Sequence, residues 1–351
     1  MTLTDAEQQH YSRHLILEDI GMAGQLQLKR AKVLVVGAGG LGCPVLQYLT
    51  AAGVGHIGII DGDKVELSNL QRQILYTPQD IGCYKATAAQ QRLELLNPNV
   101  VFTSYPTNLT PNNALELFGK YDIIVDGTDN FASRYLINDA AVLCAVPVVF
   151  GSVYKFEGQV SVFNYNNGPT YRCLYPSPPA ANTVPNCSEA GVLGVLPGMI
   201  GLLQANEVLK IICNIGRVLS AQLLTYNILN MQQVILYFNK NTDIHISALA
   251  DNYQHFCGLS TPLPSIPLDT FKTQKDNYNL LDVRTPEERA AFHIGGQHIP
   301  LNELADRYHE LPTNKDLVIY CKSGVRSQKA IQILKNTPLT VTLIYLDAII
   351  C

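Results

Sequence analysis

Strong charge of one sign, long apolar runs and an N-terminal apolar segment are all missing from this sequence. Charged residues make up 15% of the chain, and 25 Lys and Arg against 29 Asp and Glu give a formal net charge of −4. Such a chain has no strong positive field for nucleic-acid phosphates or anionic lipids, so we expect no nucleic acid and no membrane among its partners. No apolar run approaches the roughly 18 residues that a membrane span needs.

The cysteines lack the pattern of a disulfide framework. There are nine, an odd number, and their spacing is irregular. Residues 1–21 also lack the apolar core of a signal peptide. We therefore predict a cytoplasmic protein whose cysteines are buried, metal-binding or catalytic.

What the sequence does have is a regular alternation of strand and helix patterns. Its 351 residues, at about 150 residues per domain, predict two domains or a large domain with a small one. In the first half, short apolar runs rich in β-branched residues alternate with helical patterns, which predicts a doubly wound, mostly parallel α/β sheet. The predicted strands are 32–36, 55–60, 100–104, 122–125 and 148–150, and the predicted helices are 44–52, 85–96 and 133–144.

The pattern changes after residue 151. Strand patterns at 158–165, 222–227 and 233–238, around a long buried helix within 190–213, predict an antiparallel extension of the sheet. A proline-containing segment then predicts a linker at 259–268, between a domain of residues 1–258 and a small α/β domain of residues 269–351. The predicted elements of the second domain are strands 280–283, 316–320 and 341–345, with helices from residue 286 and after residue 321.

A glycine-rich turn follows the first predicted strand and opens a helix. Its string, GAGGLG, contains Gly37, Gly39, Gly40 and Gly42. These glycines permit a tight turn and let backbone N–H groups approach phosphates at the helix N-terminus. Asp61 ends the next strand about twenty residues on, where a carboxylate accepts hydrogen bonds from ribose hydroxyls. The turn therefore predicts a bound nucleotide, and NAD and ATP fit it equally well.

The residues after the second strand favour a triphosphate over a dinucleotide. Arg72 and Lys85 can supply the cations that a triphosphate needs, whereas a hydride-transfer site needs few charges. Asp129 follows another strand, at the carboxyl edge of the sheet where ligands bind in this fold class, and a carboxylate there suits Mg²⁺. The alternative is that Arg72 and Lys85 are solvated surface charges and that Asp129 is a helix N-cap.

Seven strings together resemble the MoeB/ThiF superfamily of E1-like adenylating enzymes, which activate ubiquitin-like proteins. The resemblance is to members with a C-terminal rhodanese domain, the molybdopterin-synthase adenylyltransferase and sulfurtransferase type. It implies a Rossmann-like first domain with ATP and Mg²⁺ as cofactors. The strings are HYSRHLIL (10–17), VLVVGAGGLGCP (33–44), IGIIDGDKVELSNLQRQIL (57–75), GCYKATAA (82–89), DGTDNFASRYLIND (126–139), FEGQVSVF (156–163) and CSEAGVLGVLPGMIG (187–201).

The resemblance also implies a role for each polar residue of the site. Asp61 would hold the ribose, and Arg72 and Lys85 would contact the phosphates. Asp129 would bind Mg²⁺. Arg13 would reach into the site of a neighbouring subunit, which implies a homodimer. The implied nucleotide-binding set is completed by Gly37, Gly39, Gly40, Gly42, Asp63, Asn69, Gln73 and Asn130.

The implied substrate is a ubiquitin-like sulfur-carrier protein that ends in Gly-Gly. Its terminal carboxylate would attack the α-phosphate of ATP and give an acyl-adenylate and pyrophosphate, which requires neutralised phosphate charge and in-line positioning. Cys187 lies in the loop that crosses the site in this family. Some members use a cysteine there to take the acyl group and others do not, so both roles stay open. Carriers for molybdopterin, thiamine, tRNA thiolation and cysteine synthesis are all compatible with the sequence.

A structural zinc site, usual in the family, is not expected here. Family members close it with two CxxC pairs, which gives the four thiolates that suit Zn²⁺. Here the strings are TYRC and QHFC, so that only Cys173 and Cys257 remain, and His255 could add one ligand at most. We predict no zinc at normal affinity.

The last block resembles a single rhodanese domain. Cys321, in the string CKSGVRS, follows a strand and precedes a helix, and the loop has the six-residue length of that family. Its N–H groups and the helix N-terminus would stabilise a persulfide anion on Cys321, and Arg326 would anchor the loop. A cysteine desulfurase is one possible sulfur donor. The implied persulfide loop is Cys321, Lys322, Ser323, Gly324, Val325 and Arg326.

Two features of this block depart from the family, and two other functions stay open. The linker is short, and the family usually continues beyond the equivalent of Cys351 with a glycine-rich turn and a helix, so a shortened domain is considered. An NAD-dependent oxidoreductase would use the glycine turn but leaves Arg72, Lys85 and Asp129 without a task. A non-catalytic scaffold for a ubiquitin-like partner would bind without turnover.

Overall fold

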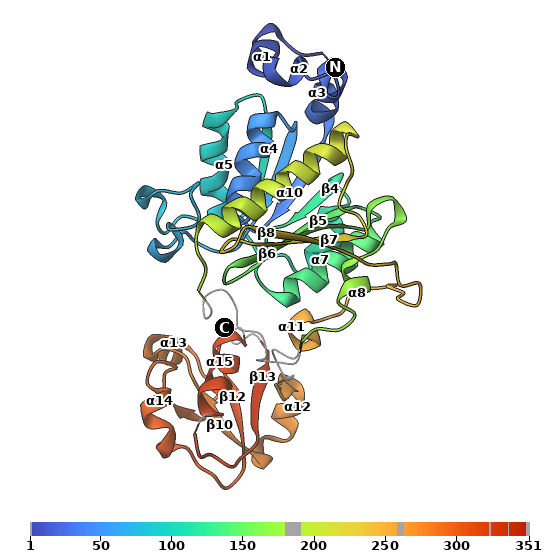
Figure 1. The fold of residues 1–351 in the computed structure, drawn as a ribbon. Coiled ribbons are helices and arrows are strands. Elements are labelled where there is room, and N and C mark those ends of the chain that lie inside the picture. Colours follow the sequence, from blue (N-terminus) through green and yellow to red (C-terminus); the bar gives the residue numbers. More distant parts are fainter. Residues whose placement is uncertain (1, 180–190, 258–262, 323, 336, 349–351) are drawn as a thin grey trace. The chain divides into compact units, whose positions relative to one another are not determined.

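The chain folds into two compact units, residues 1–259 and residues 260–351. The computed structural model describes residues 2–179, 191–257, 263–322, 324–335 and 337–348 (Figure 1). Each unit has its own β-sheet and its own hydrophobic cores. The two units are therefore described separately.

The first unit is built on an eight-stranded sheet in the order β3-β2-β1-β4-β5-β6-β7-β8. Strands β3 to β5 in this order pair in parallel, and β5 to β8 pair antiparallel. Strand β1 reads KVLVV and is buried at all but its first residue, as expected of a central strand covered on both faces. The strands are β1 Lys32–Val36, β2 His56–Ile60, β3 Val101–Tyr105, β4 Ile123–Asp126, β5 Val148–Tyr154, β6 Glu157–Phe163, β7 Gln222–Asn227 and β8 Gln232–Tyr237.

Helices cover both faces of the parallel part of this sheet. Successive side chains of a strand point to opposite faces, and β1 has buried apolar side chains on both. Val33 and Val35 pack in one core with α3, α4, α5 and α10, whereas Leu34 and Val36 pack in the other with α6 and α7. The helices are α1 Asp5–His10, α2 Ser12–Leu15, α3 Gly21–Arg30, α4 Gly42–Ala52, α5 Lys85–Leu96, α6 Pro111–Phe118, α7 Phe131–Leu143, α8 Tyr171–Leu174, α10 Val195–Cys213 and α11 Tyr253–Phe256.

Helix α10 is long and apolar enough, by length and composition, to cross a membrane, and no other helix in the described parts of the chain meets that test. In the structure it packs against α4 and the antiparallel strands (Figure 1). The buried Gln204 side chain donates from Nε2 to the carbonyl oxygens of Asp126 (2.8 Å) and Val149 (3.2 Å). These contacts are those of a core helix.

The second unit is a five-stranded sheet in the order β11-β10-β12-β13-β9, and all of its strand pairs are parallel. One core, with Leu304, Ile319 and Ile331, lies on one face, and a smaller core with Phe271 and Val318 lies on the other. The elements are β9 Ser265–Pro267, α12 Leu268–Thr273, β10 Tyr278–Asp282, α13 Pro286–Ala291, β11 Gln297–His298, α14 Leu304–Arg307, β12 Asp316–Tyr320, α15 Val325–Leu334 and β13 Leu343–Asp347.

The predicted fold class is confirmed: a doubly wound, mostly parallel sheet with an antiparallel extension, and a separate small α/β unit. The predicted linker 259–268 is wrong in its second half. Ser265–Pro267 form the edge strand β9, in which Ile266 pairs with Leu346 of β13 and is only 5% exposed. Pro264 before the strand and Pro267 at its end hid it from sequence reasoning, because proline in a run favours a loop and is tolerated at a sheet edge.

Candidate functional site

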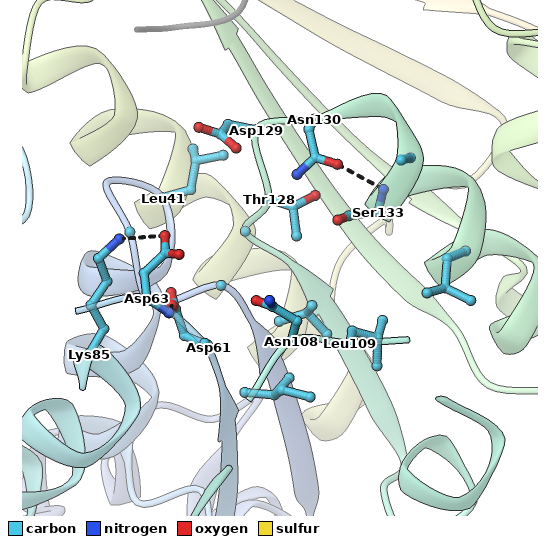
Figure 2. A pocket seen from close by; sticks show the side chains of 18 of the residues that line it. Leu41, Asp61, Asp63, Lys85, Asn108, Leu109, Thr128, Asp129, Asn130 and Ser133 are labelled. Atoms are coloured by element: carbon cyan, nitrogen blue, oxygen red, sulfur yellow. Dashed lines mark hydrogen bonds and ion pairs between the residues drawn. The ribbon is translucent and has the colours of Figure 1, made fainter. Parts of the chain in front are cut away.

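A cavity of about 700 Å³ opens at the carboxyl end of the parallel strands of the first unit. Figure 2 shows Asp61, Asp63 and Lys85 on one side of it, Thr128, Asn130 and Ser133 on the other, and Asn108 and Leu109 below. This is the position where ligands bind in doubly wound sheets. Of the predicted nucleotide-binding residues, the cavity is lined by Gly37, Gly39, Gly40, Asp61, Asp63, Asn69, Arg72, Gln73, Lys85, Asp129 and Asn130.

The glycine turn forms one wall of the cavity. Gly37 has a φ of +91°, and a Cβ on it would lie 2.9 Å from the carbonyl oxygen of Gly127. Gly42 does not line the cavity. A Cβ on Gly42 would lie 2.0 Å from the carbonyl oxygen of Gly37, so the turn can form only because Gly42 has no side chain. Helix α4 begins at Gly42, and the N–H groups of a first helical turn have no partner within the helix. The turn is therefore suited to an anion.

Asp61 ties the glycine turn to the loop after β2. Its carboxylate accepts hydrogen bonds from the backbone N–H of Ala38 (Oδ2, 2.8 Å) and of Asp63 (Oδ1, 2.8 Å). Burial raises the pKa of Asp61 above its ordinary value, and Lys85 and these two N–H groups oppose that rise. A carboxylate oxygen has a second lone pair, so each oxygen can still accept from a ribose hydroxyl.

Lys85 is buried rather than solvated. Its side chain is 8% exposed, and Nζ lies 3.0 Å from Oδ2 of Asp63, whose side chain is 71% exposed (Figure 2). The alternative of a solvated surface charge is therefore wrong for Lys85. Because an ammonium group is costly to bury without full compensation, a second anion at this position would be stabilised.

The 3-10 turn Leu67–Asn69 and the residues after it supply further polar groups to the cavity. Arg72 is partly exposed, and its Nη1 donates to the carbonyl oxygen of Ser68 (3.0 Å). The Asn69 side chain caps this turn by accepting from the N–H of Glu66 (3.1 Å). The buried Oε1 atom of Gln73 has no hydrogen-bond partner in the described residues. One cation and one buried amide thus stand beside the glycine turn.

Asp129 is not the helix cap that the alternative supposed. Asn130 is the N-cap of α7 and accepts from the N–H of Ser133 (2.9 Å; Figure 2). Asp129 is exposed, and among the described residues its carboxylate has no hydrogen-bond or ion-pair partner. Free carboxylate oxygens at a phosphate-sized cavity fit Mg²⁺, which keeps several water and phosphate ligands and rarely needs an all-protein cage.

Two parts of the cavity wall were missed by sequence reasoning. Residues 107–111, which follow β3, form the first part. The Asn108 side chain packs closely on Gly62: a Cβ added to Gly62 would lie 2.4 Å from Oδ1 of Asn108. Residues 251–254 form a second wall segment. The position of 107–111 after a parallel strand could have been recognised, since all such loops reach the same edge. Residues 251–254 carry no comparable signal.

Two predicted residues are not brought to this cavity. Arg13 lies exposed on α2 and is not among the lining residues of its own chain. Cys187 lies outside the described residues. The roles implied for these two residues stay predictions.

The second unit holds a buried thiol between β12 and α15. Cys321 follows β12 and is 2% exposed, and its sulfur accepts from the backbone N–H of Ser327 (3.4 Å). Gly324 is the N-cap of α15 and has a φ of +83°, a left-handed conformation that favours glycine. Lys322 is exposed, and Ser323 lies outside the described residues. The sulfur therefore lies at the first turn of α15, where it accepts from a backbone N–H group.

Arg326 anchors this loop through Glu288 of α13. The guanidinium donates to both carboxylate oxygens, at 2.6 Å and 2.7 Å. The hydrogen bonds from Arg326 lower the pKa of Glu288 to about 2. Sequence reasoning assigned the anchoring role to Arg326 and did not identify Glu288, which lies 38 residues away in the chain.

The two cysteines left from the zinc motif do not form a zinc-like donor set. Cys173 accepts hydrogen bonds from the backbone N–H of Thr170 (3.3 Å) and of Asn241 (3.3 Å), and Cys257 is 3% exposed in an apolar core. The described residues contain no group of three or more His, Cys, Asp or Glu that could hold a metal ion. The donor chemistry does not fit a tetrahedral thiolate site.

Comparison with known families decides the family. The family model of the ThiF family matches residues 11–245. The chain belongs to the ThiF family. A second model, the rhodanese-like domain, matches residues 268–347 of this ThiF-family protein.

One curated relative aligns with nearly the whole chain and another with about three quarters of it. The probable adenylyltransferase/sulfurtransferase MoeZ of Mycobacterium tuberculosis is 43% identical over 354 residues, which cover 95% of this chain and 90% of that protein. The sulfur carrier protein adenylyltransferase of Thermus thermophilus is 50% identical over 271 residues, covering 74% of this chain and all of that protein. The predicted enzyme class, an adenylyltransferase with a sulfurtransferase domain, is confirmed at this level.

Solved structures agree in fold. A crystal structure of Escherichia coli MccB aligns with a TM-score of 0.61 at 20% identity, over 68% of this chain and 74% of that one. A structure of MccB with ATP aligns with a TM-score of 0.59 at 22% identity, over 69% of this chain and 75% of that one. At this identity the likeness shows the fold alone.

Proposed function

We propose that this protein uses ATP and Mg²⁺ to adenylate the C-terminal glycine carboxylate of a ubiquitin-like sulfur carrier, and then transfers sulfur to it from a Cys321 persulfide. The observation that carries the first half is the cavity beside the glycine turn, with buried Lys85 on one side and free Asp129 on the other. The Thermus relative, which is named a sulfur carrier protein adenylyltransferase, supports the same substrate class.

The predicted polar residues of the cavity take the following tasks in this reaction. Asp61 accepts from the ribose, and the glycine turn and Arg72 bind phosphate oxygens. Lys85 neutralises charge that develops on the phosphates in the transition state, which is the main electrostatic demand of this chemistry. Asn69 and Gln73 position the nucleotide.

Asp129 is the residue that would hold Mg²⁺, with Asp61 and Asp63 nearby in the cavity wall. When bound, such an ion would neutralise negative charge at the phosphates. The protein contributes the Asp129 carboxylate, which immediately precedes Asn130, the N-cap of α7.

In the reaction, an oxygen of the carrier carboxylate forms a bond to the α-phosphorus of ATP. The bond between the α-phosphorus and the oxygen that bridges to the β-phosphate breaks. The products are the acyl-adenylate and pyrophosphate. No general base is needed, since the carboxylate is already ionised at neutral pH. In-line positioning therefore supplies much of the rate.

The sulfur step uses the terminal sulfur of the Cys321 persulfide as nucleophile. It attacks the acyl carbon, AMP leaves, and an acyl disulfide to Cys321 forms. A thiol co-reactant then attacks the Cys321 sulfur, forms a disulfide with it and releases the carrier thiocarboxylate. A cysteine desulfurase is the proposed source of the persulfide sulfur, and Cys187 is a candidate for covalent capture of the acyl group.

The antiparallel edge of the first unit supports a protein substrate. Strand β8 is the edge strand of the sheet and is exposed along its whole length. Leu236 and Tyr237 are 51% and 71% exposed. An exposed apolar edge strand is a surface to which a β-rich partner can add. We propose that the carrier docks here.

A homodimer is proposed on the basis of the N-terminal helices. Arg13 is exposed, and the apolar side chains that follow it, Ile16 and Leu17, are 70% and 50% exposed. Such a surface suits burial against a second copy, in which Arg13 would enter the partner's cavity.

A cytoplasmic location is proposed as well. The seven cysteines that the structure describes are free thiols, as is usual in reducing compartments.

The test is ATP–pyrophosphate exchange by the full chain with Mg²⁺ and a panel of carriers ending in Gly-Gly. Exchange with one carrier, and thermal stabilisation by ATP but not by NAD, is the expected result. Stabilisation by NAD alone would support the oxidoreductase alternative. ATP binding without exchange for any carrier would support the scaffold alternative.

A further inference from the structure

The segments that a zinc site would tie together are joined here by other contacts. Arg172 of α8 donates to both carboxylate oxygens of Asp139, from Nε at 2.7 Å and from Nη2 at 2.8 Å. The Tyr253 hydroxyl of α11 donates to the same carboxylate at 2.6 Å. These three residues, the Asp139 cluster, connect α7, α8 and α11.

The Asp139 cluster is buried and enclosed by aromatic rings. Asp139 is 3% exposed and Tyr253 4% exposed. The Arg172 guanidinium lies over the rings of Tyr135 and Phe256, at 4.9 Å and 4.6 Å from their centroids. Burial, and then the hydrogen bond to Asp139, raises the pKa of Tyr253, so its hydroxyl remains a donor. A buried carboxylate that loses one partner is costly, so each contact matters.

The cluster is connected to the nucleotide cavity by two routes. Along α7, Ser133 and Leu136 line the cavity and Asp139 follows one turn later. Along the chain around α11, Tyr253 is itself a lining residue, as are its neighbours 251, 252 and 254. The Tyr253 hydroxyl also accepts from the N–H of Ala250 (3.3 Å), which fixes the chain where it enters this wall.

We propose that the Asp139 cluster is a metal-free clasp that positions residues 251–254 as a wall of the nucleotide cavity. Asp139, Arg172 and Tyr253 are positioning residues: they act on ATP through the wall that they hold. The assignment to ATP rests on the proposed function. It also explains how the chain retains this wall with only Cys173 and Cys257 of a zinc motif.

The test compares two variants that each lose one buried phenol hydroxyl. In Tyr253→Phe the hydrogen bond to Asp139 is lost while the ring stays. The matched control is Tyr135→Phe, because the Tyr135 hydroxyl donates to the carbonyl oxygen of Tyr175 and not to Asp139. We expect Tyr253→Phe to raise the Kd and KM for ATP roughly tenfold with little change in kcat. The control should bind ATP like the wild type, even where its melting temperature falls equally.

Two further readouts separate the clasp from the nucleotide assignment. Hydrogen exchange at the amides of residues 250–257 should become faster in Tyr253→Phe than in the control, with or without nucleotide. Metal analysis should find no stoichiometric zinc, and a zinc-selective chelator should not weaken ATP binding. Equal exchange in the two variants, or a zinc ion whose removal weakens ATP binding, would overturn the clasp. Faster exchange in a protein whose wild type binds no ATP would leave the clasp standing and refute the proposed function.

Discussion

The nucleotide cavity and the Cys321 loop are built in opposite ways. In the cavity several polar groups lack full partners: Asp129 is exposed and unpaired among the described residues, and Gln73 Oε1 is buried without a hydrogen bond. In the loop, Cys321 accepts from Ser327 and is 2% exposed, and both terminal nitrogens of Arg326 donate to Glu288. The first site is prepared to receive an outside ligand, whereas the second protects a group of its own.

This difference follows the chemistry proposed for each site. A triphosphate and its metal bring their own charge, so the protein must leave cations and carboxylates available. A persulfide is a small reactive anion. Backbone N–H groups that point at the sulfur stabilise its charge, and exclusion of solvent protects it from side reactions. The predictions below separate the two sites, from the largest expected effect to the smallest.

Replacing the thiol should abolish only the sulfur step. Cys321→Ala removes the atom that carries sulfur, so carrier thiocarboxylate should fall to background while ATP–pyrophosphate exchange stays at the wild-type rate. Cys173→Ala is the control, since that thiol belongs to the first unit and accepts backbone hydrogen bonds. Loss of exchange in Cys321→Ala would show that the two chemistries are not divided between the units.

Removing the free carboxylate should abolish only adenylation. Asp129→Ala is expected to lower exchange on the order of 10²- to 10³-fold, because charge neutralisation at the phosphates is lost. Thiosulfate sulfurtransferase activity should be unchanged. Glu94→Ala, at an exposed acidic residue of α5 outside the cavity wall, is the control for a general charge effect. An exchange rate within a factor of about three of wild type would remove Asp129 from the metal site.

Charging the exposed edge strand should weaken carrier binding without affecting ATP. Leu236→Asp is expected to raise the KM for the carrier roughly tenfold, as expected for a charge placed in an apolar interface. The Kd for ATP should be unchanged. A matched control is Leu95→Asp, at a residue that is 85% exposed on α5. An unchanged KM in Leu236→Asp would place the carrier elsewhere.

Breaking the anchor of the thiol loop should have the smallest effect. Glu288→Gln loses an ion pair whose side chains are 30% and 31% exposed, so we expect a cost below about 1 kcal/mol and a few-fold slower sulfur transfer. The pKa of Glu288 is lowered to about 2. The stabilisation is therefore present above the ordinary Glu pKa and is lost as pH falls toward 2.

The measurement for this anchor is the unfolding midpoint of each protein from neutral pH down to about pH 3. The gap between wild type and Glu288→Gln should be widest at neutral pH and should narrow in acid. Glu303→Gln, which breaks the ion pair of Glu303 with Arg307 in the same unit, is the control and should not slow sulfur transfer. A gap that widens in acid would contradict the assigned pairing.

How much of this could be predicted depends on how far apart the interacting residues lie. The glycine turn, Asp61 and the strands around them follow from local periodicity and spacing, and the structure places them as expected. The neighbouring residues Asp129 and Asn130 show the limit of that approach. Both can cap a helix, and only the backbone geometry shows that Asn130 caps and Asp129 is free.

Contacts between distant residues could not be predicted. Tyr253 meets Asp139 across 114 residues of sequence, and Arg326 meets Glu288 across 38. Nothing in the local pattern of Tyr253 or Asp139 indicates the other, and the sequence assigned an anchoring role to Arg326 without indicating its partner Glu288. The strand Ser265–Pro267 was missed for a related reason: its pairing with β13 is non-local and outweighs the loop signal of its prolines.

The division of labour between the two units is tested most directly by the intact mass of the carrier after reaction. The carrier would be incubated with ATP, Mg²⁺ and a sulfur donor, together with wild type, Cys321→Ala or Asp129→Ala. We predict the mass increase of a thiocarboxylate with wild type, the acyl-adenylate with Cys321→Ala, and an unchanged carrier with Asp129→Ala. Thiocarboxylate formed by Cys321→Ala, or adenylate formed at the wild-type rate by Asp129→Ala, would contradict the account.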